Sequence, residues 1–248
     1  AGRWLCGGGM DVFFPKGPWL AVWCVFIPTY NNAGTIRRVV EEVCRQTCHV
    51  IVVDDGSTDG TADCLKDLDI LLLRHARNRG KGRALQTGLR HARFLGFDEA
   101  ITLDADGQHF ADDIPLLLQA ADRCPGCMVV GSRNLATEGM PARNTFANRF
   151  SNFWFRLQTG IRLPDTQTGY RLYPLRRMGN LWWLTARYEA ELEILVWAAW
   201  KGIPLVPVPV RVWYPPEGER VSHFRPGWDF ARISLLNTVL CGLAVVYG

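Results

Sequence analysis

Two aspartates separated by one residue, Asp104 and Asp106, are the side chains in this sequence best suited to chemistry. A carboxylate pair on one turn can bind a hard cation such as Mg²⁺ or Mn²⁺ and leave coordination positions free for phosphate oxygens, and Gln108 could supply a neutral oxygen. A structural role is the alternative, in which Asp104 caps the next turn and Asp106-Gly107 forms a tight turn. Because Asp-x-Asp pairs are common, the neighbouring segments must decide between the two.

Polar segments follow other apolar runs of the chain in the same way. In parallel α/β sheets ligands gather at the carboxyl ends of the strands, so we expect these segments to meet at one edge. Asp54 could accept a hydrogen bond from a nucleoside base there and Tyr30 could pack on that base, although Asp54 also suits a helix cap and Tyr30 a core position. The four segments are Pro28-Thr29-Tyr30-Asn31-Asn32, Asp54-Asp55-Gly56-Ser57-Thr58-Asp59-Gly60, Asp104-Ala105-Asp106-Gly107-Gln108 and Gly131-Ser132-Arg133.

A fifth polar segment, Asn78-Arg79-Gly80-Lys81-Gly82-Arg83, precedes a helical stretch. It could offer backbone N–H groups and cations, Lys81 among them, to a phosphate. Its spacing is that of neither the Gly-x4-Gly-Lys phosphate loop nor the Gly-x-Gly-x-x-Gly dinucleotide motif, so it is weak evidence alone. His109 could join the aspartates as a metal ligand, but a single histidine in such a loop is more often structural.

The elements that must position these residues alternate between apolar runs of strand length and amphipathic runs of helix length, which predicts an α/β fold. Strands apolar on both faces indicate a parallel sheet covered by helices on both sides. In the first half we expect strands at 21–27, 49–53, 70–73, 100–103 and 128–130, and helices at 34–46, 58–68, 81–95 and 112–123. In the second half we expect helices at 144–159 and 188–201, an irregular segment at 165–173 and a strand at 203–213.

The chain has 248 residues, of which 48% are hydrophobic, and this favours one domain with a large core. Its net charge of +4 is unevenly placed, since nine arginines but only Glu138 and Asp165 as acids occur between Arg133 and Arg187. Such an excess indicates an anionic partner. Phosphate on a small molecule or lipid fits better than nucleic acid, because the lysine runs of nucleic-acid modules are missing. The eight cysteines suit free thiols in a reducing, cytosolic compartment.

The C-terminal stretch 228–248 carries no charge after Arg232. Its uncharged part is shorter than the roughly twenty residues that span a bilayer. It is expected to be a helix at a membrane surface or a helix of the core or a dimer interface, and a spanning helix is the least favoured alternative. No secretory signal is visible, and residues 1–17 are left out of the fold prediction.

In order, these motifs resemble those of family-2 glycosyltransferases of the GT-A fold, and within them most closely the branch that makes dolichyl- or polyprenyl-phosphate sugars. The motifs are Ile27-Pro28-Thr29-Tyr30-Asn31, Val52-Val53-Asp54-Asp55-Gly56-Ser57-Thr58-Asp59-Gly60, Asn78-Arg79-Gly80-Lys81-Gly82, Leu103-Asp104-Ala105-Asp106-Gly107-Gln108, Gly131-Ser132-Arg133 and Asp165-Thr166-Gln167-Thr168-Gly169-Tyr170-Arg171. The resemblance implies a GT-A domain over 18–227, with a nucleotide-binding half at 18–133 and an acceptor half at 134–227. The apolar helix 228–248 would follow it.

The same resemblance implies roles for individual residues. Asp104, Ala105, Asp106 and Gln108 would surround a metal ion and a diphosphate, and Arg133 and Arg171 would meet phosphates. The branch usually has Glu at the position of Asn32, and Gly-Glu-Ser-Lys where this chain has Gly218-Glu219-Arg220-Val221-Ser222-His223. A nucleoside pocket would be lined by Pro28, Tyr30, Asn32, Val52 and Asp54.

The expected reaction is an inverting transfer of a sugar from a UDP- or GDP-sugar to a polyprenyl phosphate at the cytoplasmic face of a membrane. The metal and Arg133 would neutralise the charge that develops on the departing diphosphate. A lipid phosphate is already ionised and needs no base, whereas a hydroxyl acceptor would need one, for which Asp165 and Glu191 are the candidates. The alternatives are transfer to a hydroxyl of a lipid or glycan, a sugar nucleotidyltransferase and an inactive scaffold. Neither the sugar, the nucleotide nor the oligomeric state follows from the sequence.

Overall fold

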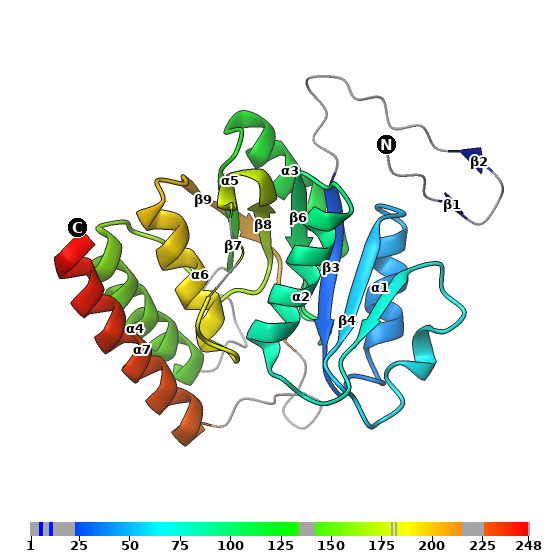
Figure 1. The fold of residues 1–248 in the computed structure, drawn as a ribbon, viewed down its shortest axis with the longest axis horizontal. Coiled ribbons are helices and arrows are strands. Elements are labelled where there is room, and N and C mark those ends of the chain that lie inside the picture. The colour runs from blue at the N-terminus through cyan, green and yellow to red at the C-terminus, as the bar shows by residue number, and fades with distance from the viewer. Residues whose placement is uncertain are drawn as a thin grey trace.

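A computed structural model describes residues 23–133, 142–179, 181, 183–214 and 226–247, together with the short antiparallel pair β1 (Leu5–Cys6) and β2 (Met10–Asp11). The segment Gly218–His223 therefore lies outside the described residues. At the centre is a sheet with strand order β5-β4-β3-β6-β8-β7-β9 (Figure 1). Its strands are β3 (Trp23–Thr29), β4 (Val50–Asp54), β5 (Leu71–Arg74), β6 (Glu99–Thr102), β7 (Met128–Arg133), β8 (Arg171–Pro174) and β9 (Leu205–Val210).

All neighbouring strands of this sheet run parallel except at β8, which is antiparallel to both β6 and β7. The predicted α/β class with a mostly parallel sheet is confirmed. The segment 165–173 was expected to be irregular, but β8 begins at Arg171. The expectation was therefore wrong for residues 171–173. Four residues are too short for a clear period-2 pattern, and the pairing partners lie far away in sequence.

Helices cover both faces of the sheet. They are α1 (Ile36–Cys44), α2 (Lys81–Phe94), α3 (Ile114–Arg123), α4 (Ala142–Thr159), α5 (Leu175–Met178), α6 (Glu189–Trp200) and α7 (Pro226–Tyr247), with 3-10 turns η1 (Asp63–Leu65) and η2 (Ala111–Asp113). The helix expected over 58–68 is wrong, since only η1 forms there. The Asp59 carboxylate accepts hydrogen bonds from Ala33 N and Thr61 N. These bonds stabilise turns in this segment at the expense of a helix.

Two hydrophobic cores lie on opposite sides of the sheet. Alternate residues of β3 contribute to each, Cys24 and Phe26 to one and Val25 and Ile27 to the other, as the alternation of side chains along a strand requires. The first core is closed by α2, α4, α6 and α7, and the second by α1 and α3. Gly88 of α2 lies on the Phe26 ring, where an added Cβ would come within 2.2 Å of a ring carbon, so glycine lets this helix approach the sheet.

The C-terminal helix α7 packs beside α4 and α6 (Figure 1). Its Leu236 and Leu240 are buried, and Asn237 accepts a hydrogen bond of 2.9 Å from Gln158 of α4. Leu235 and Val239, one turn apart, are exposed. Among the helices that the structure describes, none is long and apolar enough to cross a membrane.

Candidate functional site

The polar segments that follow β3, β4 and β6 meet at the carboxyl edge of the sheet. The strand register places Thr29 beside Asp54 and Asp54 beside Arg74, so the ends of β3, β4 and β5 are level. Strand β6 lies on the other side of β3 and leads directly into the turn that carries Asp104. The strand order thus explains why residues from distant motifs share one site.

At the centre of this edge, Lys81 bridges two carboxylates. Its Nζ lies 2.7 Å from Asp104 Oδ1 and 3.0 Å from Glu191 Oε1, so the first residue of α2 joins the β6 turn to α6. Burial alone would lower the pKa of Lys81, but the two carboxylates outweigh it and raise that pKa. Burial likewise opposes ionisation of Asp104, yet the charge of Lys81 holds its pKa below the usual value. We call Lys81, Asp104 and Glu191 the lysine cluster.

The turn after Asp104 presents the second carboxylate. Asp106 Oδ1 accepts a hydrogen bond of 3.0 Å from Gln108 N, and Gly107 has a φ of 73° that closes the turn. Thr35 Oγ1 donates to Ala105 O at 2.7 Å and ties the turn to the start of α1. Burial, together with the charge of Asp104, raises the pKa of Asp106 to about 6. A cation beside both carboxylates would relieve this repulsion.

Gly169, which sequence reasoning did not single out, lies against the Asp104 carboxylate. A Cβ at this position would come within 2.4 Å of Oδ2 and 2.7 Å of Oδ1. Thr102 Oγ1 donates to Gly169 O at 2.6 Å and holds the two segments together. The glycine of the Thr-Gly-Tyr-Arg motif was the signal for this contact, but its partner is 65 residues away and could not be read from spacing.

Arg133 and Asp165 form a separate ion pair on the same edge. The Asp165 carboxylate accepts hydrogen bonds from Arg133 Nε at 2.6 Å and Nη2 at 3.0 Å, from Asn148 Nδ2 at 2.6 Å and from Gln167 N at 3.0 Å. Burial would raise the pKa of Asp165, but Arg133 outweighs it and lowers that pKa. Both oxygens of Asp165 are therefore occupied by protein donors.

Arg171 is fully buried in β8, away from the position expected of a residue that meets phosphates. Its guanidinium donates to three backbone carbonyls, those of Thr168 at 2.8 Å, Thr166 at 3.0 Å and Glu191 at 2.7 Å. This geometry favours a positioning role, since Arg171 fixes both the 166–168 segment and the backbone of Glu191.

The residues expected to line a nucleoside pocket lie around the ends of β3 and β4. Pro28, Val52 and Asp54 are buried, whereas Tyr30 and Asn32 are partly exposed. Asp54 Oδ1 accepts a hydrogen bond of 2.8 Å from Ser57 N, and Oδ2 lies 3.0 Å from Arg74 Nε without an aligned donor among the described residues. Asn32 Nδ2 donates to Thr29 Oγ1 and Tyr30 O, so this amide helps to shape the loop itself.

The expected metal ligands fit a hard cation by their chemistry. Within the described part of the chain, no group of three or more His, Cys, Asp or Glu side chains is arranged to hold a metal ion. The expected set is instead two carboxylates and the amide of Gln108, which suits a cation that takes its other ligands from a diphosphate. His109 is buried against Tyr170, and burial lowers its pKa to about 4, which agrees with a structural histidine.

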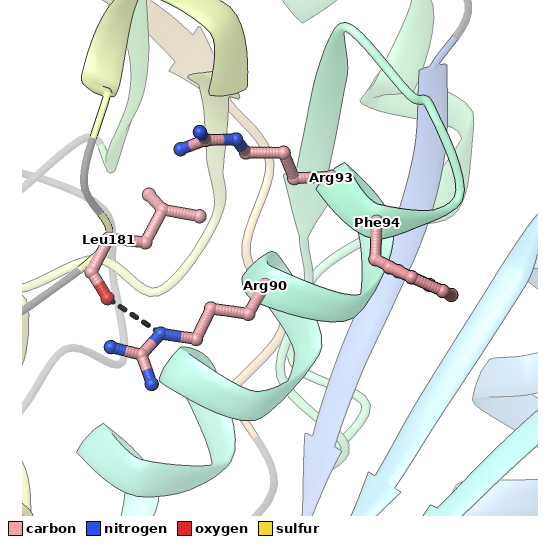
Figure 2. Close-up of a pocket in the computed structure, with 4 residues that line it drawn as sticks. All are labelled: Arg90, Arg93, Phe94 and Leu181. Atoms are coloured by element: carbon pink, nitrogen blue, oxygen red, sulfur yellow. Dashed lines mark hydrogen bonds between the residues drawn. The ribbon is translucent and has the colours of Figure 1, made fainter.

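A surface hollow lies at the other end of α2 and takes no part in this site. Figure 2 shows that it is lined by Arg90, Arg93, Phe94 and Leu181, with Arg90 Nε donating to Leu181 O at 3.0 Å. Lys81 begins α2 at the carboxyl edge of the sheet, and Phe94 ends it. The hollow therefore contains none of the residues that the sequence indicated.

The chain is similar to known proteins over most of its length. The sequence matches the model of glycosyl transferase family 2 over residues 24–179. It is 31% identical over 213 residues to UDP-N-acetylglucosamine–dolichyl-phosphate N-acetylglucosaminyltransferase of Methanococcus voltae, covering 77% of this chain and 85% of the relative. It is 33% identical over 161 residues to polyprenol monophosphomannose synthase of Mycolicibacterium smegmatis, covering 60% of each chain.

The fold also matches solved structures. One is glucosyl-3-phosphoglycerate synthase of Mycobacterium tuberculosis in complex with Mn²⁺, uridine diphosphate and phosphoglyceric acid. The TM-score is 0.67 at 18% identity, and the match covers 90% of this chain and 79% of that one. At this identity the likeness supports the fold alone.

Proposed function

This chain belongs to glycosyl transferase family 2, and we propose that it transfers a sugar from a UDP- or GDP-sugar to a polyprenyl phosphate with inversion at the anomeric carbon. The relatives named above carry dolichyl phosphate or polyprenol monophosphate in their names, which supports this acceptor class. The observation that carries the proposal is the lysine cluster beside Asp106, because it places ionised carboxylates and a fixed ammonium at the carboxyl ends of the strands.

The donor would lie along the ends of β3, β4 and β6. Asp54 Oδ2, which lacks an aligned donor among the described residues, would accept a hydrogen bond from the base, and Tyr30 would pack on it. Asp104, Asp106 and Gln108 would hold Mg²⁺ or Mn²⁺, which neutralises charge on a diphosphate when bound. Lys81 would add a positive charge from the protein on the same side. The nucleotide-binding half would thus comprise residues 18–133.

The carboxylates that could act as a base are already paired with other residues. A hydroxyl acceptor needs a general base, and Asp165 and Glu191 were the candidates. Asp165 is occupied by Arg133 and Asn148, and Glu191 pairs with Lys81. A phosphate acceptor needs neither, because its oxygen is already ionised near neutral pH. The occupied carboxylates therefore support a phosphate acceptor over a hydroxyl of a lipid or glycan, with the acceptor half at 134–227.

A lipid acceptor requires contact with a membrane, and α4 and α7 offer a suitable surface. Along α4, Arg149, Phe153, Arg156 and Leu157 are exposed, and 60% of Phe153 is accessible. Exposed aromatic and cationic side chains on one helix suit the interface of an anionic leaflet. Exposed residues on the neighbouring α7 include Arg232, Leu235, Val239 and Val245.

We propose that this surface lies at the cytoplasmic face, because the eight cysteines of the sequence suit thiols in a reducing compartment. The check is sedimentation with anionic phospholipid vesicles. The double variant Phe153→Ser, Leu157→Ser should bind at least several-fold more weakly than the parent chain. Equal binding of both would refute the α4 contact.

The direct test of the function is Asp104→Ala and Asp106→Ala, each assayed with Mn²⁺ or Mg²⁺, a panel of labelled UDP- and GDP-sugars and a polyprenyl phosphate. Transfer should fall by about a hundredfold to a thousandfold, as for the loss of a preorganised electrostatic contact. Asp63→Ala is the matched control, because this aspartate lies on the exposed η1 turn. The product should be an acid-labile sugar phosphate. Undiminished transfer by both variants, or a stable glycoside as product, would refute the proposal.

A further inference from the structure

A buried chain of hydrogen bonds links the ends of β4 and β5 to α2, the helix that begins with Lys81. Asp55 follows β4 and His75 follows β5, and both side chains are almost fully buried. His75 Nδ1 lies 2.6 Å from Asp55 Oδ1, and Nε2 lies 2.9 Å from Thr87 Oγ1 in α2. Since a carboxylate only accepts, Nδ1 carries the proton that His75 donates to Asp55. We call Asp55, His75 and Thr87 the histidine clasp.

The same carboxylate holds the turn that leads into α2. Asp55 Oδ1 accepts from Arg79 N at 2.9 Å, and Oδ2 accepts from Gly80 N at 2.7 Å. Gly80 has a φ of 95°, a conformation that glycine adopts readily. Lys81, the next residue, begins the helix. The position of its backbone is therefore set by the clasp on one side.

On the other side, the turn is pressed against the segment before α6. A Cβ on Gly80 would meet Ala186 O at 2.4 Å, and one on Gly82 would meet the Ala190 Cβ at 2.5 Å. Trp183 Nε1 donates to Gly82 O at 3.2 Å. The turn is thus held between the nucleotide-binding half and the acceptor half, and Lys81 reaches both Asp104 and Glu191 from there.

We propose that His75 and Asp55 are positioning residues, which hold the Arg79–Gly80 turn so that the Lys81 ammonium stays between Asp104 and Glu191. The clasp does not touch the donor or acceptor, and it acts through two backbone amides and the start of α2. For the effect on catalysis, this inference rests on the proposed glycosyl transfer. The position of Lys81 can be measured without any transfer.

The test compares His75→Ala with His75→Asn, whose amide retains an N–H donor in reach of Asp55. The control is His91→Ala, which lies toward the far end of α2, the helix that Lys81 begins. The readout is trace acetylation of Lys81, followed by mass spectrometry, with the exposed Lys66 of the same chain as internal reference. An ammonium held between two carboxylates is a poor nucleophile, so Lys81 should be acetylated several-fold faster in His75→Ala. His75→Asn should restore most of the protection, and His91→Ala should behave as the parent chain.

Hydrogen exchange and kinetics complete the test. Exchange of the Arg79 and Gly80 amides should rise in His75→Ala while the global unfolding midpoint stays far above the assay temperature. In the transfer assay, kcat/KM for the donor should fall by about tenfold to a hundredfold, as for the loss of an outer-shell hydrogen bond. Unchanged acetylation of Lys81 in His75→Ala would overturn the proposal, and so would raised acetylation with unchanged kcat/KM. Absence of transfer in the parent chain would instead overturn the proposed function, and acetylation would still decide the role of His75.

Discussion

Two ionic clusters share the carboxyl edge of the sheet, and they differ in how fully their carboxylates are used. Asp165 is completely buried and accepts hydrogen bonds at both oxygens from Arg133, Asn148 and the backbone. Asp104 pairs with the Lys81 ammonium through Oδ1, and 23% of the Asp104 side chain is accessible. The first cluster is closed, whereas the second is open toward solvent.

This difference indicates that Asp165 has a structural role and that Asp104 is available for chemistry. A carboxylate whose acceptor positions are filled by protein donors can hold a fold together but cannot bind a ligand without losing a partner. A carboxylate that is held by one cation and is partly accessible can take a second positive group. Sequence reasoning placed Asp165 and Asp104 together as catalytic candidates, and only the hydrogen-bond partners distinguish them.

The largest effect on stability is expected from breaking the ion pair between Arg133 and Asp165. Asp165→Asn leaves Arg133, whose side chain is only 15% accessible, without a counter-charge, which should lower the free energy of unfolding by about 3–5 kcal/mol. Urea denaturation followed by circular dichroism measures this. Glu191→Gln is the matched variant in the open cluster, where Lys81 keeps Asp104, so its loss should be much smaller. Equal losses in the two variants would mean that the two clusters do not differ as described.

The next prediction concerns the open cluster and the position of its Asp104 carboxylate. Gly169→Ala places a methyl group where the Asp104 oxygens now lie, so the carboxylate must move away from Lys81 or from its position toward the ligand. A shift of about 1 Å at a reacting centre can cost about a hundredfold, and we expect a loss of that size in kcat/KM for sugar transfer. The measurement is donor-dependent kinetics with detergent-solubilised acceptor.

Gly242→Ala is the control for this glycine, because no atom lies within 4 Å of the Cβ that it would gain. It should transfer sugar at the parental rate. If Gly169→Ala did so too, the Asp104 carboxylate would not need its present position, and the lysine cluster would lose its assigned importance.

The sequence predicted the parts of this molecule that depend on local patterns. The apolar runs of β3 and β4 are buried on both faces, and this gave the parallel sheet and, with it, the edge at which the motifs meet. Asp104 and Lys81 were predicted as site residues from their types and positions, because ligands gather at the carboxyl ends of parallel strands. The family was predicted from these motifs and is confirmed.

The rest depends on contacts between distant residues, which spacing does not encode. The family resemblance implied that Arg171 would meet phosphates, but its partners are carbonyls of its own segment and of Glu191. Asp165 appeared to be a possible base until Arg133 was found on it. Asp55 and His75 are 20 residues apart in the sequence and pair because β4 and β5 are neighbours in the sheet. The same residue type can be buried at one position and exposed at another, and the residue type alone does not tell which.

The smallest effect is expected at the opposite, amino edge of the sheet, where Glu99 begins β6 and no described residue forms an ion pair with it. Burial, with the charges of Asp122 and Asp98, raises the pKa of Glu99 to about 7. The folded state therefore favours the protonated form, and the stability this gives is present below about pH 4.5 and is lost as the pH rises through 7. Glu99→Gln should remove this loss. Because Glu99 is partly exposed, we expect a gain at pH 8 of about 1 kcal/mol, or about 2–4 °C in Tm, which shrinks toward pH 5. Thermal unfolding at the two pH values measures it, and a gain that is the same at both would show that Glu99 does not titrate in this way.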